Sequence, residues 1–113
     1  MLPQNTVKNI FLHEKIKDYI AQIIDASRNP HDYGLNLGKY IEWGGSPRAS
    51  INFFIAAKAN AFLEKRWFVI PQDIKDIAYN ILRHRILLTY DAKVNDITPE
   101  RVIYEILSKI KVP

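Results

Sequence analysis

The sequence that decides the fold is residues 44–63, GGSPRASINFFIAAKANAFL. Its two glycines free the backbone, and Ser46 then stands where a helix would start. Pro47 occupies the first helical position, where its fixed φ fits and its missing N–H is not needed. The apolar run that follows predicts a central helix from Pro47 to about Lys65. Apolar residues extend around almost its whole circumference, so we expect burial on several sides. One stripe consists of Ile51, Phe54, Ile55, Ala59 and Phe62, and it is widened by Phe53, Ala56, Ala57 and Leu63.

Arg48 breaks a local rule at the start of this helix. A cation in the first turn faces the positive end of the helix dipole, which costs roughly 0.3–1 kcal/mol at an exposed site. The same helix start offers free N–H groups to an anion, and a guanidinium adds donors that match phosphate oxygens. Residues that break a local rule without visible compensation are candidates for function. On the residues alone, a surface arginine paired with a carboxylate is the simpler interpretation.

Length and composition indicate one small globular domain or a fragment of a longer protein. The chain has 113 residues, of which 48% are hydrophobic and 25% charged, and this balance argues against disorder. It contains no cysteine, which excludes disulfides and thiolate metal sites and fits a reducing, cytoplasmic location. No apolar run approaches the roughly 20 residues of a membrane span, and we expect no signal peptide.

The net charge of +4 raises the question of nucleic acid. Basic and acidic residues alternate, however, at residues 14–18 and 73–76, as they do on solvated helix faces. Specific recognition would need basic residues gathered on one helix face, and the sequence does not gather them visibly. A helical nucleic-acid-binding module therefore remains an alternative that the sequence disfavours.

The first half of the chain predicts one amphipathic helix and a connector. Residues 1–9 are polar, and we expect a flexible segment or a remnant of an expression tag. A helix is predicted from about His13 to Arg28, and it ends before Pro30. Its stripe is Ile16, Tyr19, Ile20, Ile23 and Ile24.

Residues 29–45 form the longest irregular stretch and hold all four glycines. Residues 34–40, GLNLGKY, are similar to a phosphate-binding loop only superficially, because three residues separate the glycines and Tyr40 follows the lysine. We therefore expect a connector attached to the core by Leu35, Leu37, Ile41 and Trp43.

The second half predicts two more helices. A short extended piece at residues 67–70 precedes a helix from Gln72 to Leu88, and a loop follows from Thr89 to Asp96. Thr98 then caps the last helix, which begins at Pro99. Its inward residues are Val102, Ile103, Ile106, Leu107 and Ile110, and those of the preceding helix are Ile74, Ile77, Ala78, Ile81 and Leu82. The extended pieces at 67–70 and 96–97 could pair as a minimal two-stranded β bridge. The predicted fold is a small all-α bundle of four main helices with such a bridge.

No hydrolytic triad or metal site is legible. The three histidines His13, His31 and His84 stand far apart, and each is interpreted as a surface or capping residue. A basic cluster at Arg83, His84 and Arg85 suits the C-terminal end of a helix. A contact between this cluster and a neighbouring subunit or an acidic partner is the alternative, and its role stays open.

The segment 44–50 resembles the one that opens the second helix of the C-terminal lid in MoxR-type AAA+ ATPases. Family members read Gly-Ala-Ser-Pro-Arg-Ala there, so Gly45 replaces the usual alanine. The resemblance covers about residues 10–113. It continues through AAKA at residues 56–59, PQDI at 71–74, LRHRI at 82–86 and ITPE at 97–100.

The resemblance implies a lid domain over residues 10–113, without its N-terminal nucleotide-binding core. Arg48 would be the sensor 2 residue that acts on the γ-phosphate of ATP, and Ser46, Pro47 and Arg48 would contact the nucleotide. ATP and Mg²⁺ are implied for the full-length parent. The fragment alone is expected to bind no cofactor or metal and to catalyse nothing.

The resemblance also implies partners. These are the protein's own AAA+ core, neighbouring subunits of a ring, and von Willebrand factor A-domain proteins, with no membrane. The lid would close over ATP and relay hydrolysis to chaperone-like remodelling. A protein-interaction bundle without any ATPase role is the second alternative.

Overall fold

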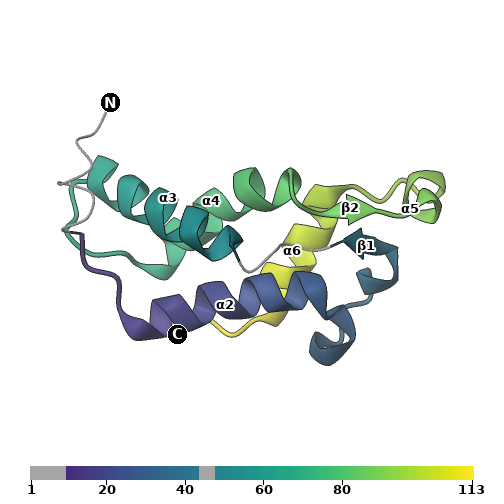
Figure 1. The fold of residues 1–113 in the computed structure, drawn as a ribbon, viewed down its shortest axis with the longest axis horizontal. Helices are drawn as coiled ribbons and strands as arrows, with labels where there is room; N and C mark the ends of the chain where they lie inside the picture. The colour runs from purple at the N-terminus through teal and green to yellow at the C-terminus, as the bar shows by residue number, and fades with distance from the viewer. Residues whose placement is uncertain (1–9, 44–47) are drawn as a thin grey trace.

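The computed structural model describes residues 10–43 and 48–113, which form an elongated helical domain of 45 × 27 × 21 Å. Four longer helices and a two-stranded sheet confirm the predicted all-α bundle with a minimal β bridge (Figure 1). In chain order the elements are α2 (Glu14–Arg28), the 3-10 turns η1 (Pro30–Tyr33) and η2 (Gly38–Tyr40), β1 (Ile41–Trp43), α3 (Ala49–Leu63), α4 (Pro71–Arg83), β2 (Leu87–Leu88), α5 (Tyr90–Val94) and α6 (Pro99–Lys109).

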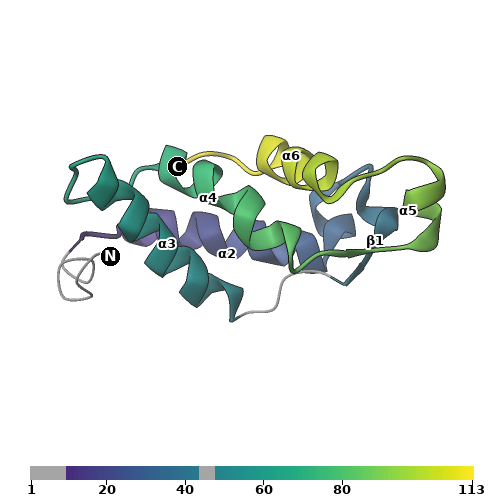
Figure 2. The same ribbon diagram turned by 90° about the horizontal axis from the view of Figure 1, so that it is seen from above.

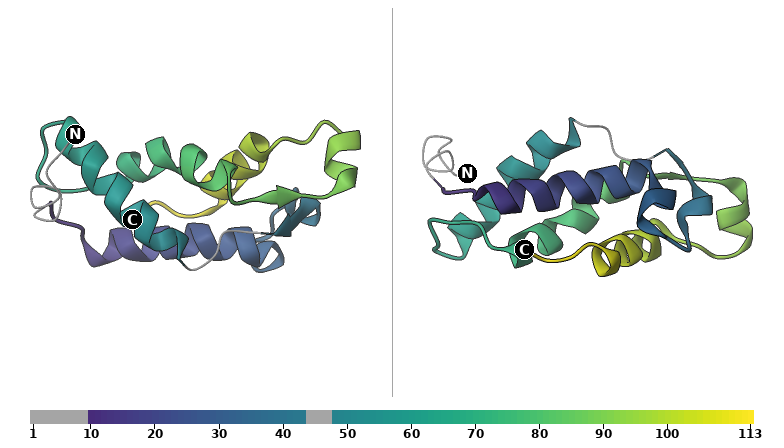
Figure 3. Two further views of the ribbon diagram at one scale, coloured as in Figure 1. Left: turned by 45° about the horizontal axis from the view of Figure 1, so that its top comes forward. Right: turned by 90° about the horizontal axis from the view of Figure 1, so that it is seen from below.

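Helix α4 lies at the centre of a layer formed by three helices. It packs against α3 on one side and α6 on the other, and Figure 2 shows the three in a row. Helix α2 covers this layer from the other side and contacts both α3 and α6 (Figure 3). The fully buried side chains where these helices meet include Ile20, Ile23, Phe53, Ile74 and Ile103. Each stabilises the fold by about 1.5–3 kcal/mol through removal of apolar surface from water.

Side-chain caps set the N-terminal boundaries of α2 and α6, and the cap at Thr98 confirms the prediction for α6. The His13 side chain accepts a hydrogen bond from the backbone N–H of Lys15 through Nδ1, at 3.0 Å. The Thr98 hydroxyl accepts from the N–H of Arg101 at 3.3 Å, and Pro99 follows at the first helical position. Each cap satisfies a donor that the first helical turn leaves without an intrahelical partner.

The prediction that the central helix is buried on several sides holds only in part: Phe54 and Phe62 pack partly buried against the core, but Ile51 and Ile55 do not. The buried face of α3 consists of Ala49, Phe53, Ala57 and Ala61, whereas Ile51 and Ile55 are exposed. Small alanines let α4 approach closely, so packing selects the alanine face over the face with larger side chains. The helix is therefore buried on one face among the described residues and keeps an exposed apolar face.

The helix predicted from Gln72 to Leu88 ends at Arg83. The carbonyl of Leu82 accepts the N–H groups of both Arg85 and Ile86, each at 2.9 Å, and this double acceptance closes the helix. The chain then extends into β2. The predicted loop at 89–96 also contains a short helix, α5, because the Thr89 side chain caps it.

The predicted pairing of residues 67–70 with 96–97 is wrong. The sheet instead pairs β1 with β2 in antiparallel fashion, with Ile41 opposite Leu88. Phe68 forms an isolated parallel bridge with Phe11, which leaves the segment at 96–97 unpaired with it. Once α4 has ended at Arg83, its continuation lies beside β1, so tertiary position decides the pairing.

The connector contains two 3-10 turns where a phosphate loop would have a strand and a helix. Gly34 has φ 63°, the left-handed conformation that closes η1. A Cβ atom on Gly38 would lie 2.5 Å from Cβ of Pro30, so glycine lets the two turns approach each other. Leu35 is buried and Leu37 and Ile41 are partly buried, as expected, whereas the side chain of Trp43 lies outside the described part. The expectations for residues 1–9 and for the turn at 44–47 also lie outside it.

Candidate functional site

Arg48 stands at the N-terminal end of α3. The helix begins at Ala49, two residues later than predicted, so Arg48 is its N-cap residue and has helical backbone angles. Its side chain is exposed, and no carboxylate within residues 10–43 and 48–113 pairs with its guanidinium. The simpler interpretation of a carboxylate-paired surface arginine therefore finds no partner in the described part of the chain. Ser46 and Pro47, the other two predicted nucleotide-binding residues, lie outside that part.

Helix α3 carries no acidic residue, and Lys58 is its single charge. The electrostatic field at its N-terminal end therefore combines the helix dipole with the guanidinium of Arg48, both positive. The positive end of a helix dipole together with a fork of charged donors suits a phosphate or carboxylate group.

The exposed apolar stripe of α3 runs along the helix from Arg48. We give that name to Ile51, Ile55 and Leu63, whose side chains are 55%, 59% and 68% exposed. Their spacing of four and eight residues places them on one helical face, and Arg48 precedes Ile51 by three. The sequence analysis assigned Ile51 and Ile55 to the core. A helix that is apolar all round in so short a chain was the signal that one of its faces could stay uncovered.

Aromatic side chains extend this apolar surface beyond the C-terminal end of α3. The ring of Phe62 meets that of Trp67 edge to face, with centroids 6.3 Å apart. Trp67 and Phe68 are both exposed, as is Phe11 on the segment that bridges Phe68. Large exposed apolar areas of this kind are typical of surfaces that contact another protein or domain.

A buried carboxylate fixes the end of α3 to the start of α4. Asp73 is 1% exposed, and its two carboxylate oxygens accept hydrogen bonds from Nη1 and Nη2 of Arg66, at 2.8 and 2.7 Å. Asn60 donates to it at 2.8 Å and the N–H of Ile70 at 2.9 Å. Burial acts to raise the pKa of Asp73, but hydrogen bonds from Arg66, Ile70 and Asn60 outweigh it and hold the pKa below its ordinary value. The sequence analysis missed this network, although an acid at the third position of a helix is a capping signal.

The histidines and the basic cluster show structural roles or exposure. His13 caps α2, whereas His31 and His84 are exposed. Arg83 pairs with Glu100 at 2.9 Å and thereby ties α4 to α6. The described residues contain no group of three side chains that could hold a metal ion.

No helix in the described part of the chain is long and apolar enough to cross a membrane.

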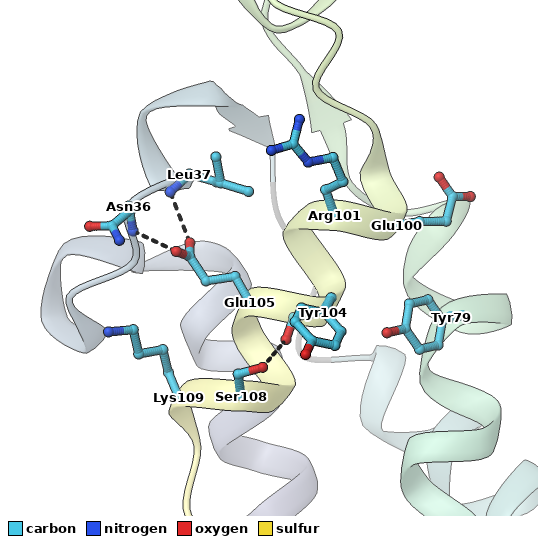
Figure 4. A pocket seen from close by; sticks show the side chains of 9 residues that line it. All are labelled: Asn36, Leu37, Tyr79, Glu100, Arg101, Tyr104, Glu105, Ser108 and Lys109. Atoms are coloured by element: carbon cyan, nitrogen blue, oxygen red, sulfur yellow. Dashed lines mark hydrogen bonds between the residues drawn. The ribbon is translucent and has the colours of Figure 1, made fainter.

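A pocket lies between α4 and α6, and none of the predicted nucleotide-binding residues lines it. Figure 4 shows Tyr79 of α4 and Tyr104 of α6 beside it, in a pocket of about 720 Å³. At its edge the Glu105 carboxylate accepts the N–H groups of Asn36 and Leu37, at 3.0 and 2.8 Å. The polar rim of the pocket is thus held in place by the connector.

Comparison with known proteins relates this architecture to characterised sequences. The family described as the AAA lid domain matches residues 36–106. Chaperone MoxR1 of Mycobacterium tuberculosis is 38% identical over 111 residues, which are 97% of this chain and 29% of that protein. Protein MoxR of Paracoccus denitrificans is 35% identical over 79 residues, 66% of this chain and 23% of that protein.

A crystal structure gives the same picture. It is that of a candidate ATPase from Cytophaga hutchinsonii, with a TM-score of 0.93 and 40% identity, and it covers 97% of this chain and 34% of that one. The chain thus spans about a third or less of the length of these relatives.

Proposed function

The chain belongs to the AAA lid domain family, and on that premise we propose that it is the lid of a MoxR-type AAA+ ATPase. In this proposal the chain is one part of a longer polypeptide whose nucleotide-binding core holds ATP and Mg²⁺. The lid closes over the nucleotide, and Arg48 acts as the sensor 2 residue on the γ-phosphate. Ser46 and Pro47, which precede it in the sequence, are the other two residues that we propose contact the nucleotide.

The observation that carries the proposal is the state of Arg48. Arg48 is exposed and stands at the start of a helix that contains no acidic residue. Its guanidinium forms no ion pair with a carboxylate among the described residues. Phosphoryl transfer spreads negative charge over the γ-phosphate oxygens, so a positioned arginine stabilises that charge and responds to its loss. The exposed apolar stripe beside Arg48 would supply the surface that packs against the nucleotide-binding core.

The Asp73 network supports transmission of the response. Because Arg66, Asn60 and Asp73 fix α3 to α4, displacement of Arg48 moves both helices together as one body. We propose that this movement passes to neighbouring subunits of a cytoplasmic ring and drives chaperone-like remodelling. Von Willebrand factor A-domain proteins are the proposed partners of that remodelling.

The test replaces Arg48 in the full-length parent. Arg48→Ala should lower the rate of ATP hydrolysis by roughly a hundredfold, because the transition state loses a charged donor. Arg48→Lys should recover part of the rate, since it keeps the charge without the planar fork. Lys58→Ala, which removes the other cation near this face, is the matched control and should leave turnover unchanged.

An unchanged rate in Arg48→Ala would remove the sensor 2 assignment and leave a lid that acts through protein contacts alone. Binding to duplex DNA that falls steeply with salt would favour the nucleic-acid module instead.

A further inference from the structure

The buried face of α3 holds the helix close to its neighbours but fixes its direction weakly. Ala49, Ala57 and Ala61 are fully buried, and Phe53 is the one large side chain on this face. A methyl side chain makes few contacts with a facing helix, so an alanine face resists tilting less than interlocked larger side chains do. The direction of the α3 axis therefore depends strongly on polar contacts at the ends of the helix.

The Asp73 network supplies such contacts at the C-terminal end of α3. Its hydrogen bonds come from three places, because Asn60 lies in α3, Arg66 in the turn and Ile70 at the N-cap of α4. The backbone N–H of Arg66 also donates to the carbonyl of Ala61 at 2.9 Å, which ties the arginine to the last turn of α3. Hydrogen bonds to a charged group are strong and directional, and those around Asp73 set the angle between α3 and α4.

The other end of α4 is connected to the segment that precedes Arg48. Beyond α4 the chain enters β2, which pairs with β1, and the N–H of Thr89 donates to the carbonyl of Tyr40 at 2.8 Å. Strand β1 ends at Trp43, five residues before Arg48 in the sequence. Helix α4 is thus the frame to which both ends of α3 are attached.

The length of α3 amplifies a small change in its direction. A helix of this length spans about 22 Å, so a tilt of about 3° at one end moves the other end by about 1 Å. A displacement of about 1 Å at a catalytic group lowers a rate by up to about a hundredfold. A small change of angle at the Asp73 network is therefore enough to alter what Arg48 does.

We propose that Arg66 and Asp73 are positioning residues for Arg48. Neither touches the nucleotide. They fix the direction of α3 and thereby the place at which Arg48 meets the γ-phosphate. The inference rests on the proposed function, since it concerns how that same arginine is held. It goes beyond the joint movement of α3 and α4, because it makes the rate of hydrolysis depend on the angle between them.

The test is a double-mutant cycle in the full-length parent, with kcat for ATP hydrolysis measured at saturating ATP. Arg66→Ala should lower kcat about tenfold when Arg48 is present. In the Arg48→Ala background the same replacement should change kcat by less than about twofold, because the group that it positions is gone. A merely structural loss would lower kcat by the same factor in both backgrounds.

Further variants match the chemistry of the replacement. Asp73→Asn should lower kcat in the same way as Arg66→Ala, and Arg66→Lys should restore part of the rate because it keeps the charge. Arg83→Ala is the control, since it removes another arginine pair between helices, with Glu100 at 2.9 Å, that joins α4 to α6 and not to α3. It should leave kcat within about twofold of the parent. Thermal unfolding establishes that each variant is folded at the assay temperature, and Arg66→Lys takes the place of Arg66→Ala in the cycle if the alanine variant is not.

Three results would overturn the inference while the sensor 2 proposal stands. The first is an unchanged kcat in Arg66→Ala, the second is an equal loss in the two Arg48 backgrounds, and the third is an equal loss in Arg83→Ala. An unchanged kcat in Arg48→Ala alone is a different failure. It would remove the proposed function, and the inference that rests on it would go as well.

Discussion

Two arginines mark the two ends of α3, and their surroundings differ completely. Arg66, just beyond the C-terminal end, forms a forked pair with Asp73, which is 1% exposed. Arg48, at the N-terminal end, is exposed and pairs with no carboxylate in the described part of the chain. One guanidinium is used within the fold and the other is left available to a group outside it. The difference teaches that the partner of an arginine, more than its place on a helix, separates a structural role from a functional one.

The largest expected effect on stability comes from breaking the Arg66–Asp73 ion pair at the C-terminal end of α3. Arg66→Ala leaves the Asp73 carboxylate buried without its cation, which should lower the free energy of unfolding by about 3 kcal/mol. That value is at the low end for buried pairs, because Asn60 and Ile70 still donate to the carboxylate and Arg66 is itself 22% exposed. Urea unfolding followed by circular dichroism measures the loss.

The matched variant is Arg66→Lys, which keeps the charge without the two-pronged geometry and should lose an intermediate amount. A loss below about 1 kcal/mol in Arg66→Ala would mean that the hydrogen-bond network around Asp73 contributes little to the stability of the fold.

A smaller effect should appear when pH titrates the same end. The pKa of Asp73 is lower in the folded chain than its ordinary value, so the folded state binds the proton less readily than the unfolded state. The stabilisation is therefore fully present above the unfolded pKa of about 3.9, and it is lost as pH falls through the folded pKa. Urea unfolding between pH 7 and pH 3 should show this decline.

The variant Asp73→Asn supplies the reference for that series. It should be less stable than the parent at pH 7, and the difference between the two should narrow toward pH 3. A constant difference across the series would show that the charge of Asp73 contributes nothing.

The smallest effect on stability is expected at Arg48, at the N-terminal end of α3. Arg48→Ala should change the free energy of unfolding by no more than about 0.5 kcal/mol, because the side chain is exposed and pairs with no described carboxylate. Paired with the loss of turnover expected in the full-length parent, this result would separate function from folding at a single residue. A loss of 1 kcal/mol or more would instead assign Arg48 a structural contact and remove the contrast with Arg66.

How far the sequence could predict the fold varied from helix to helix. The stripes of α2 and α6 were predicted correctly because each has one apolar face and a capping residue nearby. The exposed face of α3 was not predicted, because its apolar residues surround the helix and periodicity could not say which face meets α4. The β1–β2 pairing was missed because it joins segments far apart in the chain, and no local signal marks such partners.

The candidate site shows the same division. The proline and serine before Arg48 correctly indicated that the arginine stands at a helix start, although its contact with a nucleotide stays a prediction. The pocket between α4 and α6 had no signal in the sequence, because its walls come from two helices and the connector. Local patterns therefore placed single residues, and surfaces formed between elements required the structure.

The exposed apolar stripe has a consequence for anyone who engineers this chain. Ile51, Ile55 and Leu63 contribute little to its own folding, so a screen for soluble expression of these 113 residues would score polar replacements there as neutral or improved. The same replacements would remove the apolar surface through which this domain would pack against the rest of a larger protein. The reason for apolar side chains at these positions therefore lies in a contact outside the helical bundle.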